Sequence, residues 1–202
     1  MIASSNFLRV LMLPAFLGIA SLATPVLNRD ISSAVHSIQD MSTRSANTCA
    51  DPSLSKTFFE GYDGLNTAHL MDLHYSLVNV DSVQASAPPL VIFQGAVFKA
   101  WPTQQPFTVP LFRLGAANNN DFVFMVGADA QTPPIVSGFG ATGTPIIAWV
   151  YNTAVCGSVP LMSAVLAKQT DHYYTTDPDE HAGLLSLGWT DGGVVAFVLP
   201  LM

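Results

Sequence analysis

Hydrophobic and polar residues follow a pattern along the second half of this chain that recurs about every fifty residues. The segment "VPLFRL" begins at Val109 and "VPLMSAV" begins at Val159, and an aspartate stands twelve residues after each start, at Asp121 and Asp171. We align Asp72 with these two aspartates, because it lies forty-nine residues before Asp121. Such a period predicts three related units, none large enough to bury its hydrophobic face alone.

Each unit is predicted to contain three strands. The first is an entry strand, which begins with valine and proline in the second and third units, the second follows the aspartate, and the third is rich in β-branched residues. The third strands are "AVFKAWP" after Gly95, "PIIAWVY" after Thr144 and "VVAFVLP" after Gly193. We therefore predict that residues 49–202 form a single, mainly β domain of three pseudo-symmetric repeats with a β-trefoil-like fold. Strict trefoil topology and another pseudo-threefold topology both stay open, because a trefoil unit usually has more strands.

The connection between the second and third strands differs among the units. In the third unit, Asp177 is suited to cap a helix, Pro178 to begin it and Gly188 to end it. This pattern predicts a short helix in the last repeat. In the first and second units, consecutive prolines at 88–89 and 133–134 would break a regular helix.

The second strand of the third unit predicts a core face and a surface face. Because side chains alternate along a strand, Tyr173 and Tyr174 point to opposite sides. Tyr174 aligns with Phe124 and Tyr75, so these three aromatic residues are predicted to lie in the core. Tyr173 and His172 are then expected at the surface, and the three aligned aspartates are interpreted as turn residues that bond the backbone of a hairpin.

The beginning of the chain is typical of a secretory signal peptide. "MIASSNFLR" carries one positive charge, "VLMLPAFLGIASL" is apolar, and small residues end at Ala23. We predict a signal peptide at 1–23, a flexible leader at 24–48 and a secreted, extracellular product. No later stretch is apolar for long enough to span a bilayer, so no membrane association is expected after cleavage.

The chain contains two cysteines, Cys49 and Cys156. In a secreted protein they favour one disulfide, and two free or separately used thiols are the alternative. A bridge that closes so long a loop is expected to stabilise the fold by roughly 4 to 5 kcal/mol.

The charge distribution argues against two classes of partner. Fourteen acidic and seven basic residues give a formal charge of −7, and the basic residues are scattered. A nucleic-acid-binding surface needs a cluster of basic residues, so no nucleic-acid partner is expected. Binding to anionic membrane surfaces is disfavoured for the same reason.

Metal and nucleotide motifs are incomplete. "GFGATG" at 138–143 fits the glycine spacing of a dinucleotide loop, but a strand rather than a helix follows, so we interpret these glycines as turn residues. The acids near Pro178 lack the glycine of a calcium loop, and His172 and His181 belong to different predicted elements. We expect no metal and no cofactor, with Glu180 in the first helical turn and His181 solvated.

The third unit resembles an uncharacterised secreted repeat family of fungi and bacteria, known as a domain of unknown function with H-F-Y-T repeats. The matching residues are Asp171, His172, Tyr173, Tyr174, Thr175, Glu180, Gly188, Trp189, Gly193 and Phe197, together with Leu111, Phe112, Arg113 and Leu114 in the second unit. In our alignment Phe122 and Leu73 stand where the motif has its histidine. The resemblance implies an extracellular, carbohydrate- or cell-wall-associated module with no established activity.

A surface site is predicted in the third unit. Sugar-binding sites pack C–H groups on aromatic rings and bond hydroxyls with acids, amides or histidine, and Asp171, His172, Tyr173 and Trp189 supply these groups. We hypothesise a secreted, non-catalytic binding module for a glycan or cell-wall polysaccharide. No G-x-S-x-G motif is present and no catalytic residue is assigned, but a hydrolase that uses repeat carboxylates stays open, as does a protein-binding inhibitor or effector.

Overall fold

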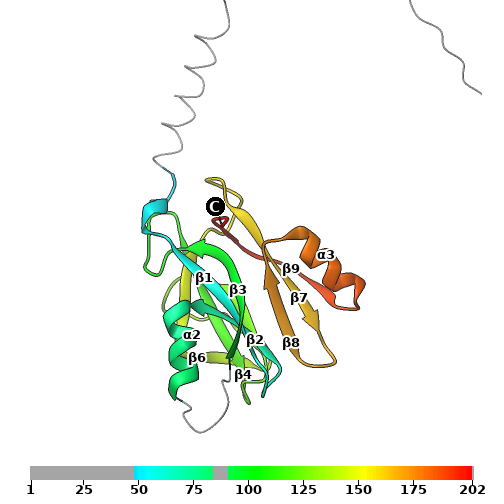
Figure 1. The fold of residues 1–202 in the computed structure, drawn as a ribbon. Coiled ribbons are helices and arrows are strands. Elements are labelled where there is room, and N and C mark those ends of the chain that lie inside the picture. The colour runs from blue at the N-terminus through cyan, green and yellow to red at the C-terminus, as the bar shows by residue number, and fades with distance from the viewer. Residues whose placement is uncertain (1–47, 84–90, 202) are drawn as a thin grey trace, which may run out of the picture. The chain divides into compact units, whose positions relative to one another are not determined.

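The computed structural model describes residues 48–83 and 91–201, which belong to one compact body (Figure 1). The predicted signal peptide and all but Thr48 of the predicted leader lie outside the described residues. In chain order the elements are η1 (Pro52–Leu54), β1 (Lys56–Asp63), β2 (Ala68–Leu73), α2 (His74–Val83), β3 (Val91–Ala100), β4 (Val109–Ala116), β5 (Phe122–Val126), β6 (Phe139–Val150), β7 (Val159–Leu166), β8 (Asp171–Thr175), α3 (Pro178–Ser186) and β9 (Thr190–Val198).

The strands form three antiparallel sheets of three strands each, in the orders β2-β1-β3, β5-β4-β6 and β8-β7-β9. In every sheet the strand that comes first in the sequence lies in the middle, between the second and the third. We call the three sheets, with the helices that follow their second strands, units 1, 2 and 3. The prediction of a mainly β, three-repeat, trefoil-like fold with a short helix in the last repeat is therefore confirmed.

The ends of the three third strands pair with one another and close the units into a ring. Isolated antiparallel bridges join β3 to β6, β6 to β9 and β9 to β3. The bridged residues are Trp101 with Trp149, Tyr151 with Phe197, and Lys99 with Leu199. Each bridge has two backbone hydrogen bonds, with N–O distances from 2.7 to 3.2 Å.

The main core contains residues from equivalent positions of all three units. The first strands contribute Phe58, Leu111 and Leu161, the second strands Met71, Phe124 and Tyr174, and the third strands Phe98, Ala148 and Ala196, with Ala100, Val150 and Val198 beside them. All of these side chains are buried. Phe98 occupies the position that is alanine in units 2 and 3. Its large side chain therefore fills the space that the two small alanine side chains leave in the shared core.

The predicted register of unit 1 is wrong by four residues. The pairing of Met71 with β1 is equivalent to the pairing of Tyr174 with β7, so Met71 and not Tyr75 is the counterpart of Tyr174. Tyr75 belongs to α2 and is 71 % exposed, so its predicted place in the core is also wrong. The aromatic and small residues from His74 onward suggested a strand, but the buried Leu77 packs the helix against β2 and β3. Packing of one apolar side chain thus overrides a weak local preference for strand.

Helix α3 follows its predicted capping signals. The Asp177 side chain accepts hydrogen bonds from the backbone N–H groups of Asp179 and Glu180, at 2.9 and 3.4 Å, and Pro178 is the first helical residue. The helix packs against β7 (Figure 1), which buries His181 and brings its Nε2 within 3.1 Å of the Ser163 carbonyl oxygen. The predicted solvated position of His181 is therefore wrong.

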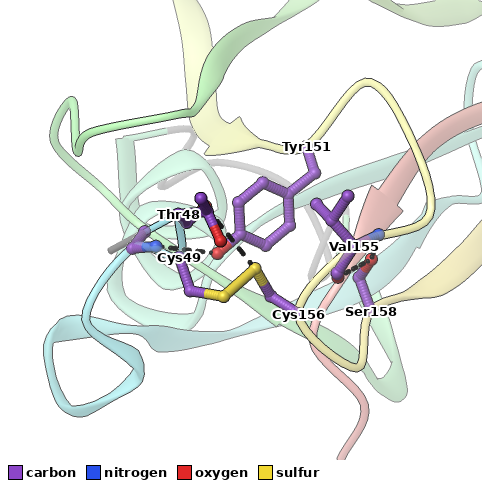
Figure 2. Close-up of a disulfide and its surroundings, with 7 residues drawn as sticks. Thr48, Cys49, Tyr151, Val155, Cys156 and Ser158 are labelled. Carbon is purple, nitrogen blue, oxygen red and sulfur yellow. Dashed lines mark hydrogen bonds between the residues drawn. A yellow bond between two sulfur atoms is a disulfide. The ribbon is translucent and has the colours of Figure 1, made fainter. Parts of the chain in front are cut away.

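The disulfide between Cys49 and Cys156 is present and links residues 107 positions apart (Figure 2). It lies beside the ring of Tyr151, whose hydroxyl accepts the backbone N–H of Ala50 at 2.9 Å. The indole N–H of Trp101 donates to the backbone of the same segment at 2.6 Å. Because Tyr151 and Trp101 are bridge residues, the disulfide holds the start of the described chain against the closed ring.

Truncation of Tyr174 to Ala tests this register. The Tyr174 ring lies in the core and its hydroxyl accepts the Phe124 backbone N–H at 3.0 Å, so Tyr174→Ala should lower the free energy of unfolding by about 3 to 5 kcal/mol. The exposed Tyr75 is the matched control, and Tyr75→Ala should change stability by no more than ~0.5 kcal/mol. Urea unfolding followed by circular dichroism measures both. A larger loss for Tyr75→Ala than for Tyr174→Ala would contradict the register.

Candidate binding cleft

Histidine–aspartate pairs join neighbouring units at two of the three seams between them. Nδ1 of His69 in unit 1 lies 2.9 Å from the Asp171 carboxylate of unit 3, and Nδ1 of His172 in unit 3 lies 2.8 Å from the Asp121 carboxylate of unit 2. Each carboxylate also accepts the backbone N–H of its histidine, at 3.1 Å. The interpretation of these aspartates as hairpin turn residues is therefore wrong, because they connect units. His172 is partly buried in this contact rather than free at the surface.

The third seam has lost both members of the pair. The histidine position is held by His69, Phe122 and His172, and the aspartate position by Ala68, Asp121 and Asp171. Our alignment had assigned Leu73 to the histidine position of unit 1, and the structure places His69 there instead. In unit 2, Phe122 packs against the apolar cluster of unit 1. Loss of both partners avoids the cost of one buried group left without the other.

The seam between units 1 and 3 opens into a cavity of about 280 Å³, which we call the Glu60 cleft. Its walls come from β1 and β3 of unit 1 and from β8 and the first turn of α3 in unit 3. The lining residues are Glu60, Gln94, Gly95, Ala96, Val97, Tyr173, Tyr174, Thr175, Thr176, Asp177, Glu180 and Leu201. Gly95 pairs with Glu60 across the sheet and has a φ of 151°, so no side chain from that position fills the cleft.

Glu60 is a buried carboxylic acid in the lining of this cleft. The residue is 2 % exposed, and its Oε1 has no hydrogen-bond partner among the described residues. Burial raises the pKa of Glu60 to about 8, the backbone N–H of Tyr174 and the Tyr173 side chain oppose this shift, and the charges of Glu180 and Asp171 add to it. The acid is therefore mostly protonated at neutral pH and can both donate and accept a hydrogen bond.

Tyr173 connects Glu60 with the second carboxyl group of the cleft. The Tyr173 hydroxyl donates to Oε1 of Glu180 at 2.9 Å. Burial, followed by the charge of Glu60 and the hydrogen bond to Glu180, raises the pKa of Tyr173 above its ordinary value, so the hydroxyl stays protonated. The ring of Tyr173 makes edge contacts with His69 and Trp189, at centroid distances of 5.0 and 6.2 Å.

The structure brings the four predicted ligand residues to the seams but gives them different positions. Tyr173 lines the cleft, and the half-buried Trp189 contacts the Tyr173 ring but is not a lining residue. Asp171 is buried against His69, whereas His172 faces the other seam of unit 3. Only Tyr173 is therefore placed to touch a ligand in the Glu60 cleft.

The lining of the cleft is acidic. Glu60, Asp177 and Glu180 contribute carboxyl groups, and no lysine or arginine is among the described lining residues. A negatively charged ligand would be repelled and would find no cation to pair with. Neutral hydroxyl groups or an amine are suited to these acceptors and donors.

Sequence reasoning did not single out Glu60. The sequence contains one signal that could have indicated it. An acidic residue stands within the aromatic-rich strand "KTFFEGYD", and charged residues are rarely buried in a strand without a partner. The strand register shows that Arg113 and Ser163 occupy the equivalent positions, which differ in every unit. That comparison needs the correct register of unit 1, which the alignment on Asp72 did not provide.

The predictions about metal binding and dinucleotide binding can be compared with the structure directly. The residues described in the structure contain no group of three or more metal-ligating side chains. Gly138 lies in a turn with a φ of 86°, but residues 139–143 belong to β6, so the interpretation of this glycine segment as a turn holds only at its start. The helix that dinucleotide binding requires does not follow it.

The chain belongs to a family described as a domain of unknown function (DUF5648), which matches residues 67–199. The match spans β2 to β9 and leaves out β1, which carries Glu60. No curated protein and no solved structure matches the chain. Within the described residues, no helix has the length and apolar character needed to cross a membrane.

Replacement of Glu60 by Gln should remove a pH dependence of stability. The carboxyl group has an ordinary pKa of 4.5 in the unfolded chain and about 8 in the fold, so the unfolded state loses its proton first as pH rises. The wild-type free energy of unfolding should therefore fall between these two values and level off above them, by on the order of a few kcal/mol.

Urea unfolding from about pH 4 to pH 9 measures this dependence as the difference between wild type and Glu60→Gln. The exposed Asp179 is not part of the cleft lining, so Asp179→Asn is the matched control and should keep the wild-type slope. Equal slopes for wild type and Glu60→Gln would show that Glu60 is not a buried neutral acid.

Proposed function

We propose that this protein is a secreted, non-catalytic binding module whose Glu60 cleft binds a glycan or cell-wall polysaccharide. The observation that carries the proposal is the set of polar groups in the cleft: a protonated acid, a tyrosine hydroxyl and a carboxylate, with no cationic side chain from the described part of the chain in the lining. Sugar hydroxyls both donate and accept, so a saccharide is suited to the Tyr173 hydroxyl and the Glu180 carboxylate, while the nearly inaccessible Glu60 would act through Tyr173.

The contact between Tyr173 and Glu180 suggests how a sugar would bind. A ligand hydroxyl that replaces Tyr173 as the donor to Oε1 of Glu180 would free the Tyr173 hydroxyl to turn toward Glu60, the other acid with which it interacts. The unpartnered oxygen of Glu60 would thereby gain a donor. Binding would thus improve the hydrogen bonding of a group that is poorly satisfied in the free protein.

The predicted signal peptide and the disulfide support an extracellular location. Disulfides persist in oxidising compartments, and the bridge from Cys49 to Cys156 fixes the segment that would follow the predicted leader. A binding module outside the cell would meet cell-wall and cell-surface glycans.

A glycoside hydrolase is the second candidate, and one observation favours it. Such enzymes use a pair of carboxyl groups of which one is a protonated acid, and the cleft holds the protonated Glu60 together with a second carboxyl group, Glu180. We prefer binding because Glu60 is nearly inaccessible and Glu180 is engaged by Tyr173. Release of reducing sugar by the wild type that is lost in Glu60→Gln would establish the hydrolase.

A glycan array followed by calorimetry tests the proposed function. The chain from residue 24 should bind a neutral or amine-bearing glycan and ignore acidic glycans, because the cleft is acidic. Glu180→Gln should weaken binding of that glycan about tenfold or more, equivalent to at least ~1.4 kcal/mol. Asp179→Asn removes a neighbouring charge outside the cleft lining and should leave affinity within about twofold of the wild type. No binding across fungal, plant and bacterial glycans would overturn the proposal.

A further inference from the structure

The Glu60 cleft has an equivalent at another seam. The strand register places Arg113 of β4 where β1 has Glu60. Glu60 lies beside β8, the second strand of unit 3, and Arg113 lies beside β2, the second strand of unit 1. In both cases a helix follows that second strand: α3 beside Glu60 and α2 beside Arg113. At the third seam the equivalent residue is Ser163, and residues 127–138, which follow β5, contain no helix.

The cavity at the seam between units 1 and 2 has a volume of about 630 Å³, and we call it the Arg113 cleft. It is lined by strand residues from both units and by the exposed start of α2. The lining residues that matter here are Asp72, Tyr75, Asn79, Arg113, Thr144 and Ile146.

Arg113 brings unused hydrogen-bonding capacity to this cleft. Its Nη1 donates to Oδ2 of Asp72 at 3.2 Å, while its Nε is buried without a hydrogen-bond partner in the described part of the chain. A guanidinium has further N–H donors, so one contact with Asp72 does not satisfy it. The ion pair also cancels the charge of the cleft, because Arg113 and Asp72 are the only charged residues among the described residues of its lining.

The rim of the Arg113 cleft offers an exposed aromatic ring. Tyr75 is 71 % exposed, and Asn79 is exposed on the next turn of the same helix. Thr144 adds a hydroxyl from β6, and Ile146 adds an apolar surface. A cleft whose two charges are paired and that offers an aromatic ring, an amide, a hydroxyl and an incompletely satisfied guanidinium is suited to a neutral molecule rich in hydroxyl groups.

We propose that the Arg113 cleft is a second saccharide-binding site, selective for neutral sugars. This inference rests on the proposed function of the Glu60 cleft and extends it from one site to two sites of different charge. A polysaccharide that reaches both clefts would bind more tightly than a short oligosaccharide, since the second contact forms at high effective concentration.

Nuclear magnetic resonance titration with chitohexaose and laminarihexaose, two neutral hexasaccharides, tests the proposal. The amide signals of Asn79, Thr144 and Ile146 report on the Arg113 cleft, and those of Gly95, Thr176 and Glu180 report on the Glu60 cleft. The chain from residue 24 is titrated as wild type, Tyr75→Ala, Glu180→Gln and Ile135→Ala. Ile135 is 99 % exposed and lines neither cleft, so it controls for loss of an exposed hydrophobic side chain.

At least one hexasaccharide should shift both groups of signals in the wild type. Tyr75→Ala should weaken binding about tenfold at the Arg113 cleft only, Glu180→Gln should do so at the Glu60 cleft only, and Ile135→Ala should weaken neither. Shifts confined to the Glu60 cleft overturn the second site and leave the proposed function standing. Shifts confined to the Arg113 cleft support the second site and overturn the proposal that the Glu60 cleft binds a sugar. No shift in either group with either sugar overturns the second site as a neutral-sugar site.

Discussion

Six backbone hydrogen bonds between the ends of β3, β6 and β9 close the three units into a ring, and the rest of the structure depends on this closure. The apolar face of a three-stranded sheet has to be buried against another element, and the three faces together bury a common core. Closure also brings the second strands of neighbouring units together. The His–Asp pairs and both clefts lie at these seams.

The three units are alike at their core positions and differ at their seam positions. Equivalent core positions hold only hydrophobic residues, and their volumes compensate one another, as with Phe98 and its two alanine equivalents. The equivalent seam position holds Glu60, Arg113 or Ser163, which differ in charge and length. Function is therefore expected where the units differ, since the shared positions are sufficient for the fold.

The sequence predicted features that depend on local patterns. The strands of units 2 and 3 have a regular period, helix α3 has a capping aspartate followed by proline, and two cysteines allow one intramolecular bridge. Unit 1 was misaligned because Ala68 stands where the other units have an aspartate, while Asp72 offered a false match nearby. The Glu60 cleft was not predicted, because it joins residues more than a hundred positions apart across a seam.

Hydrogen exchange of the bridge amides is the most direct test of the closed ring. The six donors are the backbone N–H groups of Lys99, Trp101, Trp149, Tyr151, Phe197 and Leu199. If the units depend on one another, these amides should exchange only through global unfolding, with the same free energy as the slowest amides of β1, β4 and β7. Faster exchange of the bridge amides, while the centres of the sheets stay protected, would show that the units open separately and would contradict the account.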